Sequence, residues 1–211
     1  ISDSVKWEDA ALVEPFAIGS HCTGRGRVVE DDVVFILGTG TIGSIILQTC
    51  KAKGCKTVIC CDISDSSLER AKEYGADYVI NSKTQDVVAE IQKITDGHGC
   101  TVAFDSACFP GSLTMCLQPG ILCNAGRMVP MGFCTEKEGI TQAMINQREL
   151  DIIGSRMSQD AFEPTIARME KGEYITEGIA TTFIKFSEID KVFHLMDHPD
   201  ESAKKMVILF D

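Results

Sequence analysis

The chain has 211 residues, of which 44% are hydrophobic and 24% are charged, and its formal net charge is −11. This length holds one large domain, or one domain and part of another, and the composition is that of an ordinary globular protein. The acidic charge argues against a nucleic-acid partner, because phosphate binding needs clustered Lys and Arg. No apolar run is long enough to span a bilayer, so we expect no membrane partner.

The ten cysteines need an interpretation, because clustered thiols often hold zinc or form disulfides. No two of them have the CxxC spacing of a zinc ribbon or a thioredoxin-like site. Several lie inside apolar runs such as VICC, where a free Cys behaves as a small hydrophobic residue. We expect no signal peptide before them. We therefore expect reduced structural thiols in a cytoplasmic protein.

From Asp31 onward, short apolar runs alternate with helical stretches. The run VVFIL is continuously apolar, which is typical of a strand buried on both faces. The stretch after it has helical periodicity and ends at Gly54, a plausible helix C-terminus. The pattern predicts strands at 33–37, 56–62, 77–81 and 100–107, with helices at 42–54, 64–75 and 84–97 between them.

The second half continues this alternation with weaker signals. We expect strands at 126–133 and 149–155, a helix at 158–172, and then a strand, a helix and a strand at 179–186, 188–196 and 204–211. Alternating strands and helices predict an α/β fold, a doubly wound parallel sheet with helices on both faces. We expect a connecting helix region at 1–30, the sheet domain at 31–172, and a separate strand–helix–strand unit at 173–211.

The segment ILGTGTIGS contains a GxGxxG motif between a predicted strand and a predicted helix. Gly38 permits the tight turn, Gly40 lets a pyrophosphate approach the backbone, and Gly43 permits close packing of helix on strand. Phosphates then lie at the helix N-terminus, where free N–H groups and the helix dipole favour anions. A glycine turn without a ligand is the alternative.

Asp62, at the end of the next strand, lies 19 residues beyond Gly43, where a carboxylate can bind both hydroxyls of an adenosine ribose. The 2′-phosphate of NADP would be repelled there, and no Arg follows within DISDSS. NAD is therefore the favoured cofactor, with an Asp that only caps a helix as the alternative.

The other motifs give weaker evidence of function. His194 and His198 have the spacing of two metal ligands on a helix, but the Glu of an HExxH motif is replaced by Leu195. No Tyr has a Lys four residues further on, which the short-chain dehydrogenase reaction needs. From Asp31 onward, we find no convincing catalytic acid, base or nucleophile. This part of the chain is expected to bind a nucleotide while chemistry comes from elsewhere.

Together, GTGTIGS, AKEYGADYVIN, FDSA and the earlier ALVEPFAIGSHC resemble the cofactor-binding half of zinc-dependent medium-chain dehydrogenases/reductases. The ALVEPF segment is similar to that of the polyol branch, which contains sorbitol, threonine and sugar-acid dehydrogenases. The resemblance implies that an N-terminal GroES-like domain carrying the zinc ligands is absent, that the terminal segments pack on it, and that the chain forms a homo-oligomer, here through the sheet edge at 149–155.

The resemblance also assigns residues. It implies oxidation of a secondary alcohol, in a polyol, sugar acid or hydroxy amino acid, by hydride transfer to NAD. Threonine is disfavoured, because Ser67 replaces the Arg of threonine dehydrogenases. The implied cofactor residues are Asp62 for the adenosine, Thr41, Ile42 and Gly43 for the pyrophosphate, Met131, Gly132, Phe133 and Ile153 for the nicotinamide side, and Arg156 near the phosphates.

Glu14 is the one implied catalytic and metal-facing residue, either binding the zinc or holding its water once the absent domain is present. Because Pro15 disfavours helical geometry at the residue before it, we expect Glu14 at a bend and exposed to solvent. The alternative is a carboxylate at a helix N-terminus, where it favours the dipole. Two other functions stay open: a free-standing NAD-binding sensing module, and a zinc-free quinone reductase, which Asp62 disfavours.

Overall fold

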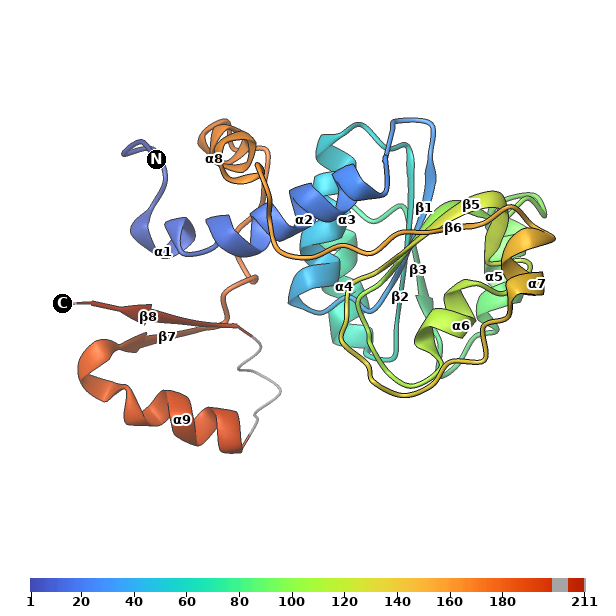
Figure 1. Ribbon diagram of the computed structural model, residues 1–211. Coiled ribbons are helices and arrows are strands. Elements are labelled where there is room, and N and C mark those ends of the chain that lie inside the picture. The colour runs from blue at the N-terminus through green and yellow to red at the C-terminus, as the bar shows by residue number, and fades with distance from the viewer. Residues whose placement is uncertain (199–204, 211) are drawn as a thin grey trace.

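A computed structural model describes residues 1–198 and 205–210. Its main element, within these residues, is a sheet of six parallel strands in the order β3-β2-β1-β4-β5-β6 (Figure 1). The predicted doubly wound parallel sheet is confirmed, and this strand order is that of the dinucleotide-binding Rossmann fold. The strands are β1 (Val33–Leu37), β2 (Thr57–Asp62), β3 (Tyr78–Asn81), β4 (Cys100–Asp105), β5 (Leu122–Pro130) and β6 (Asp151–Ile152).

Helices cover both faces of this sheet, because alternate strand residues point to opposite sides. Val34 and Ile36 of β1 join one buried cluster, whereas Phe35 and Leu37 join the other. The first cluster is completed by α2 (Val13–Arg25), α3 (Thr41–Ala52), α4 (Asp65–Glu73) and α8 (Phe162–Glu170). The second is completed by α5 (Val87–Ile94), α6 (Ser112–Cys116) and α7 (Gln142–Asn146). The sheet is therefore buried on both sides, as its continuous apolar strands require.

The structure differs from the sequence prediction in the short elements. The strand expected at 126–133 begins earlier, at Leu122, and the one expected at 149–155 has only two residues in the ladder. Helices α6 and α7 were not predicted, and α1 (Trp7–Ala10) lies in the helix region expected at 1–30 without having been predicted as a separate helix. Each of the three has four or five residues, too few for a helical period to be recognised in the sequence.

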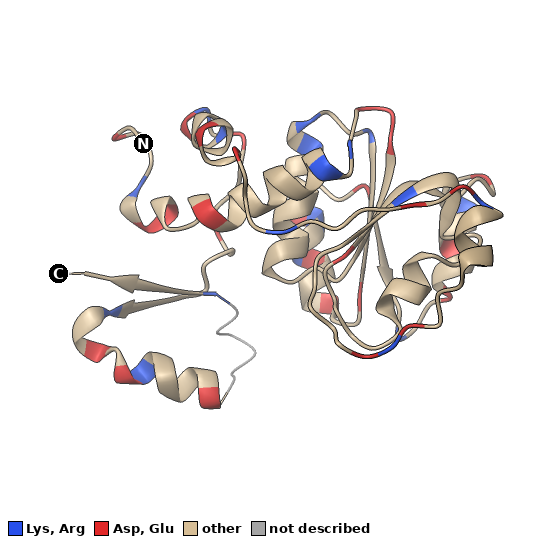
Figure 2. Ribbon diagram, in the orientation of Figure 1, with Lys and Arg blue, Asp and Glu red and all other residues tan. Residues whose placement is uncertain are grey.

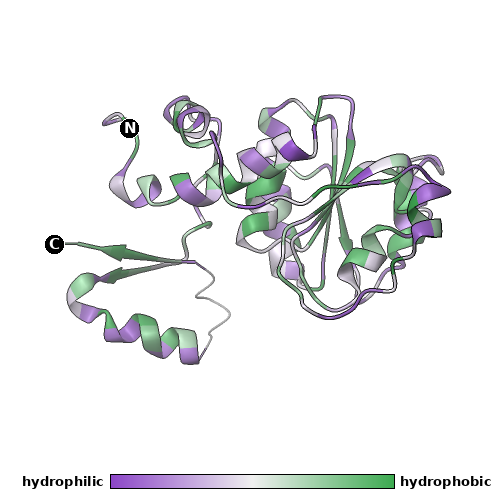
Figure 3. Ribbon diagram, in the orientation of Figure 1, coloured by the Kyte–Doolittle hydropathy of each residue, from purple (hydrophilic) through white to green (hydrophobic). Residues whose placement is uncertain are grey.

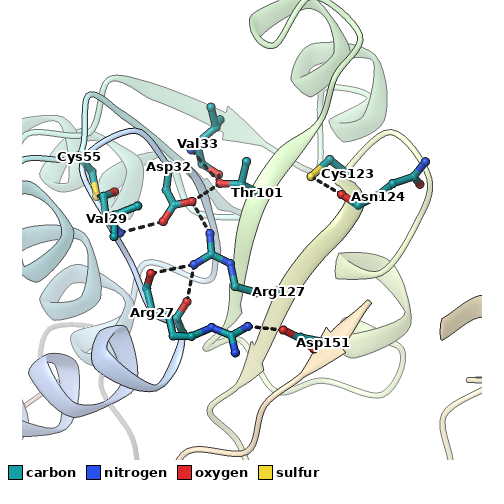
Figure 4. A network of polar contacts seen from close by, with 11 residues as sticks. Arg27, Val29, Asp32, Val33, Cys55, Thr101, Cys123, Asn124, Arg127 and Asp151 are labelled. Carbon is teal, nitrogen blue, oxygen red and sulfur yellow. Dashed lines mark hydrogen bonds and ion pairs between the residues drawn. The ribbon is translucent and has the colours of Figure 1, made fainter. Parts of the chain in front are cut away.

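A buried ion pair ties the amino-terminal edge of the sheet together (Figure 4). Asp32, only 5% exposed, pairs with Arg127 of β5 and accepts hydrogen bonds from the Thr101 hydroxyl of β4 (2.7 Å) and the Val29 N–H (2.8 Å). Arg127 also donates to the carbonyl oxygens of Gly26 and Arg27, at 2.9 and 2.8 Å. The network thus joins the α2–β1 turn to the two strands beyond β1, and every charge in it has a partner.

Most of the cysteines are free thiols built into the core, in agreement with the expected structural role. All ten fall within the described residues and are free, and seven of them are buried. Burial raises the pKa of the Cys61 and Cys100 thiols to about 12, so both are neutral at physiological pH. Cys134 is the exposed member of the set. The buried thiols therefore pack as small hydrophobic side chains rather than as reactive groups.

The C-terminal unit lies apart from the six-stranded sheet (Figure 1). It consists of β7 (Thr182–Lys185), a short 3₁₀ turn at Phe186–Glu188, α9 (Asp190–Asp197) and β8 (Met206–Leu209), and its two strands pair in parallel. Strand, helix and strand were all predicted, although residues 204 and 211 of the predicted last strand lie outside the described residues. Apolar residues recur along this unit (Figure 3), and Phe183, Phe193 and Met196 are at least half exposed.

Residues 173–180 connect the two units and still pack on the larger one. Gln48 of α3 exchanges two hydrogen bonds with the backbone of Ile175, at 2.6 and 2.9 Å. The Tyr74 hydroxyl donates to the carbonyl oxygen of Glu177 (2.7 Å), and the ring of Tyr174 lies 4.5 Å from that of Phe16. The larger core therefore continues past Gly172, where the sequence pattern puts the boundary.

Two further observations agree with the composition, namely the distribution of charged residues and the character of the helices. Lys and Arg are dispersed among Asp and Glu over the ribbon (Figure 2). Across residues 1–198 and 205–210, we find no helix with the length and apolar character needed to cross a membrane.

We predict that Arg127→Met lowers the free energy of unfolding by about 3–5 kcal/mol, because it leaves the buried Asp32 carboxylate without its counter-charge. Arg27→Met is the matched control, since the Arg27–Asp151 pair is more than half exposed and worth at most about 1 kcal/mol. Chemical denaturation measures both. Equal losses in the two variants would contradict the role given to the buried pair.

Candidate dinucleotide site

The turn between β1 and α3 is tightly packed, and two glycines make it possible. Gly38 has a φ of +88°, a conformation that L side chains rarely adopt, and an added Cβ would lie 2.8 Å from the Ala107 nitrogen. A Cβ on Gly43 would lie only 1.9 Å from the Gly38 carbonyl oxygen. The first turn of α3 therefore packs directly on the end of β1, in agreement with the packing role predicted for Gly43.

The N-terminus of α3 is open toward solvent. Gly40, the residue before the helix, supplies no capping side chain, and an added Cβ there would meet no protein atom within 4 Å. The first backbone hydrogen bond of the helix runs from the Ser44 N–H to the Gly40 carbonyl oxygen, at 2.9 Å. The N–H groups of Thr41, Ile42 and Gly43 precede it and have no intrahelical acceptor. This geometry fits a phosphate group.

Asp62 ends β2 beside this turn, as the motif spacing predicts. Its Oδ2 accepts hydrogen bonds from the Thr39 N–H (2.7 Å) and the Thr39 hydroxyl (2.9 Å). Its Oδ1 accepts from the N–H groups of Ile63 (2.7 Å) and Ser64 (3.0 Å). The carboxylate is partly exposed. Its contact with Thr39 places it next to the open N-terminus of α3, and the surrounding backbone N–H groups fix its orientation. The contact with Thr39 was not foreseen from the sequence.

A mainly apolar cavity of about 200 Å³ lies at the same end of the sheet, beyond the carboxyl ends of the strands. Residues from α2, from α3 and from the segments after β5 and β6 line it. Its lining residues are Ile18, Ile42, Met131, Phe133, Ser155, Arg156 and Met157. The Arg156 guanidinium carbon lies 5.1 Å from the centre of the Phe133 ring, a cation–π contact. Four residues expected near the cofactor, Ile42, Met131, Phe133 and Arg156, thus meet in one cavity.

The remaining predicted residues lie nearby but outside this cavity. Ile153 is half-buried and lines a neighbouring cavity beside α2. Gly132 packs directly against Cys108, because a Cβ added to Gly132 would lie 1.6 Å from the Cys108 sulfur. Ser155 was missed by sequence reasoning, yet its buried hydroxyl has no hydrogen-bond partner in the described structure. A single serine after a short strand carries no signal in a sequence, so only the tertiary structure finds it.

The predicted bend at Glu14 is wrong. Glu14 is the second residue of α2, and Pro15 is the third. Proline fits the first turn of a helix because the N–H groups there have no intrahelical acceptor. Glu14 is exposed, as predicted, and its charge lies where the helix dipole favours an anion. A side chain that leaves the apolar face thus explains how a charge is tolerated within ALVEPF.

The described residues form no metal site, in contrast to the turn and the cavity, whose geometry suits a dinucleotide. Within residues 1–198 and 205–210, no three His, Cys, Asp or Glu side chains come together to hold one. His194 and His198 lie with ring centres 4.8 Å apart on the exposed end of α9, without a third ligand among these residues. A tetrahedral zinc site needs three or four protein ligands. Glu14 alone therefore does not make a zinc site.

Comparisons with known proteins agree with this geometry. The chain is 33% identical to the starvation-sensing protein RspB of Escherichia coli K12 over 100% of its own length, and 29% identical to sorbitol dehydrogenase of Bacillus subtilis over 98%. The solved structure of an alcohol dehydrogenase (rspB) from E. coli CFT073, complexed with NADH, covers the whole chain at 31% identity and a TM-score of 0.88.

The chain spans 61% and 59% of the lengths of these two curated relatives, and 61% of the solved structure. Residues 41–171, which run from the open N-terminus of α3 through α8, match the zinc-binding dehydrogenase family along their whole length. The chain belongs to the zinc-binding dehydrogenase family, and the match covers its Rossmann domain from α3 onward, without β1.

Proposed function

We propose that this chain binds NAD(H) and is the cofactor-binding part of an enzyme that oxidises a secondary alcohol. The observation that carries the proposal is the position of Asp62 beside the uncapped N-terminus of α3, with the apolar cavity further along the same edge. The ribose acceptor, the anion site and the ring cavity thus follow one another in the order of the adenosine ribose, the pyrophosphate and the nicotinamide in a dinucleotide.

The residues would divide the cofactor between them. The N–H groups of Thr41, Ile42 and Gly43 bind the pyrophosphate, and Asp62 accepts hydrogen bonds from the adenosine ribose. Met131, Gly132, Phe133 and Ile153 surround the nicotinamide side, and Arg156 approaches the phosphates from the rim of the cavity. The bound cofactor supplies the hydride acceptor, while these residues orient it and exclude water from the ring.

The remainder of the proposal concerns the whole enzyme. Its substrate class is a polyol, a sugar acid or a hydroxy amino acid, in line with relatives named sorbitol, butanediol and erythritol/L-threitol dehydrogenases. The zinc ligands come from a domain outside this chain, and Glu14 faces that metal or its water. The C-terminal strand–helix–strand unit packs on the same domain. The expected packing of 1–30 and 173–211 on that domain is thereby narrowed, because α2 and residues 173–180 pack on the six-stranded sheet domain instead.

We predict that the unmodified chain binds NADH at least about tenfold more tightly than NADPH, because Asp62 repels a 2′-phosphate. Asp62→Asn should weaken NADH binding by about 1.5–3 kcal/mol, roughly 10- to 150-fold, since it removes hydrogen bonds to a charged acceptor. Asp65→Asn, three residues further on, is the matched control and should change little. Fluorescence titration with both cofactors measures this, and equal affinities in the unmodified chain would contradict it.

We predict that the purified chain contains no stoichiometric zinc and has no alcohol dehydrogenase activity, because its donor groups do not converge. Elemental analysis together with an NAD reduction assay on sorbitol and 2,3-butanediol tests both parts. One zinc per chain would refute the prediction, and loss of that zinc in His194→Ala would then assign it to α9.

We predict self-association through the edge of the sheet at β6, where Ile152 is 38% exposed and the strand lacks a neighbour on its outer side in the described structure. Ile152→Lys should shift the equilibrium toward monomer, because it brings like charges together at the edge. Sedimentation velocity over a range of concentrations measures it. A chain that stays monomeric at the highest concentration would count against the prediction.

A further inference from the structure

The carboxylate of Asp62 has no free acceptor position in the unliganded protein. Counting the described residues, Oδ2 takes two hydrogen bonds, from the Thr39 N–H and the Thr39 hydroxyl, and Oδ1 takes two, from the N–H groups of Ile63 and Ser64. A carboxylate offers about four lone-pair positions, two on each oxygen. Each ribose hydroxyl that donates to this carboxylate therefore has to displace a donor already present.

The four donors differ in how easily they can leave. Three are backbone N–H groups, fixed by the β1–α3 turn and by the turn that leads into α4. The backbone of Thr39 is held from its other side as well, because its carbonyl oxygen accepts a hydrogen bond from the Ser44 hydroxyl at 3.1 Å. The Thr39 hydroxyl is the one donor that can turn away without moving the main chain, since it rotates about single bonds.

A displaced Thr39 hydroxyl also needs a new partner. Thr39 is only 3% exposed, so its hydroxyl has little access to water once it leaves Asp62. A ribose hydroxyl that donates to Asp62 can accept from Thr39 at the same time, because a hydroxyl both donates and accepts. This new hydrogen bond goes to a neutral acceptor in place of the charged carboxylate, so it is weaker than the one that Thr39 gives up. A 2′-phosphate has no such donor for the carboxylate.

We infer that the Thr39 hydroxyl is an internal competitor for the adenosine-ribose site: it holds in the free protein the acceptor position on Asp62 Oδ2 that a ribose hydroxyl takes in the complex. This inference rests on the proposed NAD-binding function. Thr39 is thereby a positioning and affinity-setting residue. It keeps the carboxylate oriented when the site is empty and weakens the binding of ligands that must displace it.

The test uses the 211-residue chain and titration calorimetry with NADH. Thr39→Val keeps the shape and the N–H but removes the hydroxyl, so NADH binding should tighten roughly 2- to 10-fold, the range for the net effect of one hydrogen bond. Thr39→Ser keeps the hydroxyl and is the matched control, with an affinity close to that of the unmodified chain. Thr39→Ala repeats the test should the Val variant be poorly folded.

The second arm uses an NADH analogue whose adenosine ribose lacks both hydroxyls. The gain from Thr39→Val should disappear with this analogue, because nothing in it competes for the carboxylate. A purely structural role for Thr39 would change the affinity for both ligands alike. Weaker or unchanged NADH binding in Thr39→Val, or an equal gain with the analogue, overturns the inference while leaving NAD binding itself intact.

Failure of the proposed function has a different signature, namely an unmodified chain that binds neither NADH nor NADPH. A structure of the unmodified chain with NADH gives a check that needs no variant. Thr39 Oγ should then lie within hydrogen-bond distance of a ribose oxygen, with that oxygen on Asp62. If Thr39 Oγ remained at 2.9 Å from Asp62 Oδ2 and made no contact with the ribose, the inference would be overturned.

Discussion

The absence of a side chain at Gly43 is the constraint on which the proposed site depends. An added Cβ would lie 1.9 Å from the Gly38 carbonyl oxygen, so any other residue would push the first turn of α3 away from β1. Ser106 at the end of β4 reinforces the same contact, since its hydroxyl donates to the carbonyl oxygens of Leu37 and Gly38 at 3.0 and 2.7 Å. The open N–H groups of α3 are therefore held at the point where the strand order reverses.

The orientation of the Asp62 carboxylate depends on this constraint, because the carboxylate accepts two hydrogen bonds from Thr39 in the turn between β1 and α3. A helix displaced from β1 would carry Thr39 with it and release half of the hydrogen bonds that orient the carboxylate. Phosphate site and ribose acceptor are thus one structural unit, built from two parallel strands and the loops that follow them. The buried Arg127–Asp32 pair lies at the opposite end of the sheet, near the amino-terminal ends of β1 and β4. It supports the fold there without contacting this unit.

The sequence predicts what depends on local spacing and misses what depends on tertiary contact. The six-stranded alternation, the glycine turn and the place of Asp62 follow from periodicity and from the distance between two strand ends along the chain. The contact between Thr39 and Asp62, and the meeting of Ser155 with Ile18 and Ile42, arise only when separate elements pack together. The wrong bend at Glu14 has a similar cause: Pro15 restricts its neighbour locally, but packing of Phe16 and Ala17 in the core favours the helix.

The most direct test of the central claim is the change in backbone amide chemical shifts on titration with NADH, measured on isotope-labelled protein. The account predicts the largest changes at Thr41, Ile42 and Gly43, with a second group at Ile63 and Ser64 beside the carboxylate. The chain also has a larger cavity, about 650 Å³, between α3, α4 and α8, lined by Lys51, Arg168 and Lys171. Changes confined to that cavity, with the turn between β1 and α3 unaffected, would contradict the account.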